Sequence, residues 1–256
     1  GAAPFLGLIT SVKLKTYDFR NVYRLESCIG PNQLALLLEE AESWPNSASL
    51  FWSFREELKI YALIEDDDNR LSKKYIQDII NSIYFKSAKI TKISSVRGLG
   101  ELDIPNLTFP SKYYSEVISL LGPTLKGKCS DLIKILETLI ESRPNQYCYL
   151  ACQQLGGKTS EISKDFTSFV HRDSIWKVWI TGYWHPGDEQ IKQESLHWME
   201  KAWESLEDFF PGVHLAQLHP HLHWHKKETK AAFKQWLPKL KLLKSTCDPK
   251  GVLPPL

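Results

Sequence analysis

The order of strand-like and helix-like segments in the first hundred residues is the feature that most restricts the fold. Alternating apolar and polar residues predict strands over 22–28, 49–54, 59–65 and 88–96, and apolar residues at helical spacing predict helices over 32–43 and 71–82. This β-α-β-β-α-β order produces an antiparallel sheet with both helices on one face. We therefore expect an α+β fold whose first half is ferredoxin-like.

The rest of the chain repeats such signals less regularly. Helical patterns cover 113–121, 130–141 and 188–210, and strand patterns cover 146–154, 166–170, 175–184 and 213–218. We expect the two halves to pair into one broad antiparallel sheet with helices on one face. The other face would then be free to cover a ligand.

Composition excludes several classes of protein. A chain of 256 residues, 43% of them hydrophobic, is long enough to bury a sizeable core. Its net charge of +2 gives no basic stripe for nucleic acid. No apolar run approaches the roughly 20 residues of a membrane helix, and no secretory signal is visible, so we expect a soluble, cytoplasmic protein. The five cysteines form no CxxC pair and are expected to be reduced.

One run, residues 155–173, has the character of a pocket wall. It joins the tight turn Gly156-Gly157 to the pair His171-Arg172, just before the Trp-rich segment 175–184. A cationic, hydrogen-bonding pair at that place suits a ligand contact. The alternative is structural: the pair would satisfy backbone carbonyls or a carboxylate such as Asp173.

This run resembles a segment of the berberine-bridge-enzyme-like FAD-linked oxidases, in which a Gly-Gly turn precedes Asp-x-Thr-x-Phe-x-His-Arg and a strand that ends in Trp. The matching residues here are Gly156-Gly157, Asp165, Thr167, Phe169, His171-Arg172 and Trp184. Residues 1–10 are similar to the glycine-rich stretch that closes the flavin domain of the family. Residues 239–253 are similar to its last helix and Asp-Pro turn.

The resemblance implies a division of the chain. Residues 1–18 would be the last strand of an FAD-binding domain otherwise absent, 19–218 a substrate-binding α+β domain, and 219–256 a segment that docks toward the FAD domain. The function implied is the substrate-binding part of an FAD-dependent oxidoreductase, which passes hydride from a small organic substrate to flavin. Its partner would be an FAD-binding domain, fused or separate, and the chain alone would be inactive. An exposed apolar face would favour a homodimer.

The same resemblance suggests site residues but names no catalytic one. Substrate contacts are expected from His171, Arg172, Trp179, Tyr183, His214 and Gln217. The backbone of Gly7, Leu8 and Ile9 is expected to approach FAD, although these residues and Val12 would equally begin a strand.

Two departures from the family pattern favour an alternative function. The position of the usual polar base is, by register with Trp184, occupied by Trp179, and an indole cannot accept a proton. The later Tyr-x-Asn motif is missing from residues 213–217. The alternative is therefore a non-catalytic ligand-binding or interaction module derived from the family.

A histidine-rich run follows at residues 218–225. His219, His221, His223 and His225 alternate, and HxH on an extended strand is a metal-ligand spacing. This leaves open a third function, a metal-dependent protein. Pro220 favours an edge or loop instead, so we expect no metal here and a solvated loop lining or flanking the pocket.

Overall fold

The computed structural model describes residues 3–66, 70–95, 97, 112–215 and 219–256, and it contains one eight-stranded antiparallel sheet. The order of the strands in this sheet is β4-β1-β3-β2-β6-β7-β5-β8. The first half of the chain supplies, in order, β1 (Val22–Cys28), α2 (Pro31–Ala41), β2 (Ala48–Phe54), β3 (Leu58–Glu65), α3 (Arg70–Asn81) and β4 (Lys89–Ile93). The second half supplies β5 (Tyr114–Gly122), α5 (Cys129–Glu141), β6 (Tyr149–Gln154), β7 (Trp176–Trp184), α6 (Glu189–Leu206) and β8 (Gly212–Val213).

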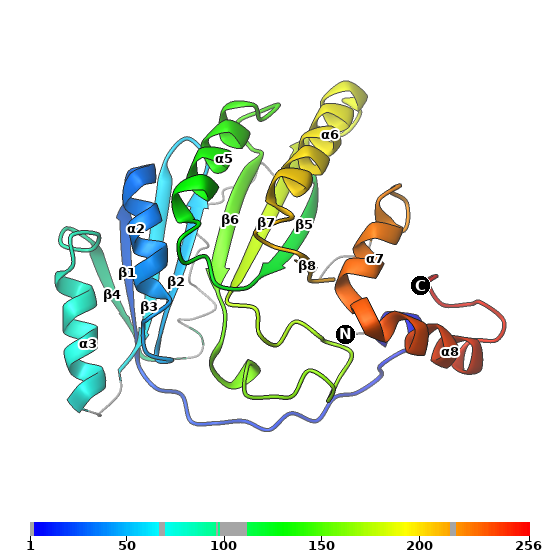
Figure 1. Cartoon of the computed structure of the whole chain (residues 1–256), viewed down its shortest axis with the longest axis horizontal. Helices are drawn as coiled ribbons and strands as arrows, with labels where there is room; N and C mark the ends of the chain where they lie inside the picture. Colours follow the sequence, from blue (N-terminus) through cyan, green and yellow to red (C-terminus); the bar gives the residue numbers. More distant parts are fainter. Residues whose placement is uncertain (1–2, 67–69, 96, 98–111, 216–218) are drawn as a thin grey trace.

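Both halves have the same β-α-β-β-α-β order, and they meet where β2 pairs antiparallel with β6. The α+β class and the ferredoxin-like first half predicted from the sequence are confirmed. Figure 1 shows α2, α5 and α6 side by side on one face of the sheet. The sheet ends at β4, which carries Lys89 and Lys92, and at the two-residue strand β8.

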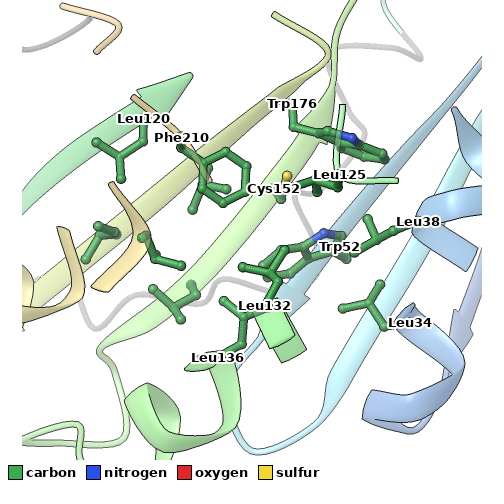
Figure 2. Packing of buried hydrophobic residues seen from close by; sticks show 14 of the residues in the cluster. Leu34, Leu38, Trp52, Leu120, Leu125, Leu132, Leu136, Cys152, Trp176 and Phe210 are labelled. Atoms are coloured by element: carbon green, nitrogen blue, oxygen red, sulfur yellow. The ribbon is translucent and has the colours of Figure 1, made fainter. Parts of the chain in front are cut away.

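The main core lies between the sheet and these helices. Every second strand residue faces the helices, so Trp52 of β2 and Trp176 of β7 are both fully buried. Figure 2 shows how they meet leucines from α2 and α5: Leu34, Leu38, Leu132 and Leu136. Burial of such large side chains contributes roughly 1.5–3 kcal/mol each.

Two polar side chains join the halves next to this core. Glu42 Oε1, just after α2, accepts hydrogen bonds from Trp176 Nε1 at 2.8 Å and from the Leu125 amide at 2.6 Å. Gln154 accepts from the Leu50 amide at 3.0 Å and donates to the Ala41 carbonyl at 2.6 Å. Each satisfies groups that burial would otherwise leave unpaired.

The two ends of the chain pack together beyond β8 (Figure 1). The helices there are α1 (Ala3–Leu6), α7 (His225–Phe233) and α8 (Leu237–Cys247), and the short 3-10 turn η2 (Lys234–Trp236) joins α7 to α8. Another 3-10 turn, η1 (Gly157–Thr159), lies between β6 and β7. Phe5 packs edge-on against Phe233 at 5.8 Å, and Lys244 Nζ donates to the Phe5 carbonyl at 3.1 Å. Residues 7–21 then run from α1 back to β1 without helix or strand structure.

Several predicted elements are wrong. Residues 113–121 were expected to be helical, but they form β5, because the segment pairs with β7 on one side and β8 on the other. The short strand expected at 166–170 is irregular, with bends at 166–168 and coil at 169–170. No strand begins at Leu8, Ile9 and Val12, since α1 and coil occupy this region and no strand pairs with it. Of the strand expected at 213–218, only β8 is present, and 216–218 lie outside the described residues.

Within the described ranges, no helix combines the length and the apolar character that crossing a membrane requires.

We predict that Gly122→Ala destabilises the protein by about 1–3 kcal/mol. A Cβ at this end of β5 would lie 2.5 Å from Phe210 Cδ1 and would also collide with the backbone carbonyl of Phe209, which has no side-chain freedom to move away. Urea unfolding followed by tryptophan fluorescence measures the change.

Gly7→Ala is the matched control, because no heavy atom lies within 4 Å of a Cβ at Gly7. Equal stability of the two variants would contradict the close approach of Gly122 to Phe209 and Phe210.

Candidate functional site

The sheet face opposite α2, α5 and α6 carries a row of aromatic rings, which we call the aromatic face. Tyr61 of β3 stacks on Phe51 of β2 with 4.5 Å between ring centroids, and Phe51 lies 5.8 Å from Trp179 of β7. Tyr149 of β6 stacks on Tyr183 of β7 at 6.3 Å. The strand register brings these residues together from both halves of the chain.

Cationic side chains lie over these rings. Arg24 is 4.8 Å from the Tyr61 centroid, Arg55 is 4.4 Å from Tyr149, and Lys177 is 4.6 Å from Trp179. The π-face of an aromatic ring attracts cations through its quadrupole. These contacts therefore keep the three cationic side chains close to the surface of the sheet. The aromatic face is therefore apolar, with single cations set against its rings.

Lys177 and Thr181 are the polar groups of β7 on this face. Burial lowers the pKa of Lys177. Thr181 is only 1% exposed, and its hydroxyl has no hydrogen-bond partner among the described residues. An unpaired buried hydroxyl is costly unless a ligand or water satisfies it.

His214 lies at the same end of the aromatic face as Lys177. Its amide donates to the Ser119 carbonyl at 2.9 Å, which fixes its backbone just after β8. Burial, with the charges of Lys177 and His171 nearby, lowers the pKa of His214 to about 4, so the imidazole is neutral at pH 7. Its buried Nδ1 has no partner within the described part of the chain.

His171 and Arg172 make structural contacts in this geometry. His171 Nε2 donates to the carbonyls of Ala231 and Ala232 at 3.0 and 3.1 Å, and burial lowers its pKa. Arg172 donates to Thr167 Oγ1 at 2.9 Å. These contacts agree with the structural alternative, in which the pair satisfies backbone carbonyls, and substrate contact stays a prediction for both residues.

The other predicted site residues fall into three groups. Trp179, Tyr183 and His214 lie on or beside the aromatic face, where burial raises the pKa of Tyr183. Gln217 lies outside the described residues. Gly7, Leu8 and Ile9 lie in exposed coil, and their contact with FAD stays a prediction.

The histidine-rich run does not form the solvated loop that we expected. His219 is 1% exposed and lies between two carboxylates, with Nδ1 2.7 Å from Glu228 Oε1 and Nε2 3.1 Å from Glu116 Oε2. His221 and His223 are exposed and pair with Glu116 and Glu200. The run turns and enters α7, so its imidazoles do not share one face.

The charges around His219 decide its protonation. Burial alone would lower its pKa, but Glu116 and Glu228 outweigh burial and raise the pKa to about 9. Burial would likewise raise the pKa of Glu116, but His219 and His221 lower it overall. Among the residues that the structure describes, no group of three or more His, Cys, Asp or Glu could hold a metal ion.

Sequence reasoning missed Lys177, Thr181, Phe51 and Tyr61. For Lys177 and Thr181, the alternation of residues 176–184 could have predicted their position, because the even-numbered residues Trp176, Val178 and Ile180 enter the core. The odd positions must then point to the opposite face.

Comparisons with known proteins agree with this fold. No family model matches the chain. Reticuline oxidase from Eschscholzia californica is 28% identical over 119 residues, which are 46% of this chain and 21% of that enzyme. A BBE-like protein from Arabidopsis thaliana has a similar structure, with a TM-score of 0.66, 14% identity and coverage of 90% of this chain and 55% of that chain.

A second similar structure is GilR, an oxidoreductase solved with pregilvocarcin. Its TM-score is 0.69, with 12% identity and coverage of 91% of this chain and 55% of that chain. The chain thus spans about half the length of these solved relatives.

We predict that the free energy of unfolding decreases by at most about 3 kcal/mol as the pH rises through 9, because of His219. Its folded pKa of about 9 is above its ordinary value of 6.5, so its contribution is complete below pH 6.5 and is lost as the pH rises through 9. Denaturant unfolding at a series of pH values measures this decrease.

His219→Gln should remove this part of the pH dependence, whereas His197→Gln, at an exposed position of α6, should retain it. The same pH dependence in His219→Gln and in the unsubstituted protein would show that the ion pairs with Glu116 and Glu228 do not stabilise the fold.

Proposed function

Because the chain is related to the berberine-bridge-enzyme-like FAD-linked oxidases and has the fold of their C-terminal half, we propose that it is the substrate-binding part of an FAD-dependent oxidoreductase. The observation that carries this proposal is the aromatic face. It presents a planar, apolar surface with a few polar groups on and beside β7, which is the usual character of a site for a flat organic molecule.

The polar groups of this face fit a flavin and its substrate. Thr181 offers a buried hydroxyl, and neutral His214 offers a buried ring nitrogen, neither with a hydrogen-bond partner among the described residues. A heteroaromatic ring with carbonyl and amide groups at its edge would satisfy both. When bound, FAD supplies the chemistry by accepting a hydride from the substrate.

The residues of the chain itself would orient the substrate and exclude water. Phe51, Tyr61 and Trp179 form the apolar floor. His214, in the tautomer that carries its proton on Nε2, accepts a hydrogen bond at Nδ1 from a substrate hydroxyl. Trp179 cannot accept a proton, so its role is to pack against the substrate.

A partner domain that binds most of the FAD is part of this proposal. Exposed apolar side chains recur along residues 7–21 and on α8, and exposed apolar side chains in such numbers suit a docking surface. They are Leu8, Ile9, Val12, Leu14, Tyr17 and Leu242, each at least 67% exposed.

Nothing in the comparisons favours the alternative function, a non-catalytic ligand-binding or interaction module.

We predict that a protein which joins this chain to its FAD-binding domain purifies with bound flavin, and that Leu14→Glu lowers the flavin content severalfold. A buried carboxylate without a partner would weaken docking of the two parts. The ratio of flavin to protein absorbance measures the content.

Ile83→Glu provides the control, because Ile83 is a comparably exposed apolar residue, 70% against 77% for Leu14, in the turn between α3 and β4. A joined protein that stays colourless and takes up no added FAD would refute the proposed function. Equal loss of flavin in both variants would refute the docking surface.

A further inference from the structure

Lys177 is a cation in an unusual position. It lies on the central strand β7, with its ammonium 4.6 Å above the Trp179 ring, and it is half-buried. No Asp or Glu oxygen lies within the 4.0 Å ion-pair distance of Lys177 Nζ in the described ranges. Other cations near the sheet have such partners, for example Arg24 with Glu26 at 2.5 Å and Lys92 with Asp66 at 3.8 Å.

The neighbours of Lys177 do not compensate its charge. Its pair partners in the sheet are Gln153 of β6 and Leu121 of β5, which are both uncharged. His214 lies close enough for the charge of Lys177 to act on it, and His214 is neutral. A half-buried charge without a counter-ion is unfavourable, so the site favours an anion from outside the described residues.

We propose that this end of the aromatic face binds the carboxylate of a planar aromatic acid. Lys177 pairs with the carboxylate, and the aromatic ring of the ligand lies along Trp179 and Phe51. This inference deepens the proposed function and rests on it, since it assigns the substrate of the same site to the class of aromatic acids.

The positions of Lys177 and the aromatic rings indicate that one ligand contacts both, instead of an anion and an aromatic ring binding at separate sites. Lys177 and Trp179 are two residues apart on one strand and therefore point to the same side of the sheet. Phe51 pairs with Gln153, which pairs with Lys177, so the rings of Phe51 and Tyr61 lie in the same cross-strand line as Lys177.

The experiment compares cinnamate with its neutral analogue cinnamamide. Isothermal titration calorimetry of the whole chain should show that cinnamate binds about tenfold more tightly than cinnamamide, as expected for a charge-assisted hydrogen bond. Lys177→Gln should abolish this preference and Lys177→Arg should retain it, with folding checked by circular dichroism.

Lys59→Gln is the matched control. Lys59 lies on β3 of the same sheet, but it is paired with Glu57 at 3.7 Å, so its loss should leave the preference unchanged. Equal binding of the two compounds, no binding of either, or an unchanged preference in Lys177→Gln would overturn the inference.

The cinnamate experiment and the flavin-uptake experiment test the two proposals independently. A cinnamate preference that depends on Lys177, in a chain whose joined form takes up no FAD, would retain the acid site and reject the oxidoreductase. Flavin uptake without any such preference would retain the oxidoreductase and reject the acid site.

Discussion

The pairing of β2 with β6 is the contact on which the rest of the structure depends. Four residue pairs, from Phe51 with Gln153 to Phe54 with Leu150, join two four-stranded halves into one sheet. On one side of this seam, Trp52 and Cys152 are paired and face α2 and α5. On the other side, the seam brings Phe51 within 5.8 Å of Trp179. Core and candidate site are thus two faces of the same backbone pairing.

The sequence predicted elements well where β-branched and aromatic residues gather in a short segment. Residues 59–65 and 175–184 are of this kind, and both are strands close to the expected bounds. Residues 113–121 carry a weaker strand signal, because the end of β5 is apolar on both faces: Leu120 enters the core and Leu121 is buried on the aromatic face beside Lys177. Pairing with distant strands decided the structure there, and no local pattern reports it.

Prediction of the site was less complete for a related reason. His171 looked like a ligand contact because its type and position suit one, but its hydrogen bonds to Ala231 and Ala232 depend on α7, sixty residues along the chain. His219 looked solvated in a run of alternating histidines. Its burial results from Glu116, more than one hundred residues earlier in the chain, and from Glu228 on α7. Such long-range partners cannot be inferred from spacing within a short run.

The two edges of the sheet differ in how they discourage unwanted pairing. An edge strand exposes unpaired amide and carbonyl groups, to which a strand of another molecule can add. At one edge, β8 has only two residues and packs against α7, so little backbone is offered. At the other edge, β4 places Lys89 and Lys92 along its five residues, and a second copy aligned there would set like charges against each other. Within the described part of the chain, both edges therefore disfavour growth of the sheet into larger assemblies, so an association of two copies is favoured through side-chain surfaces over backbone.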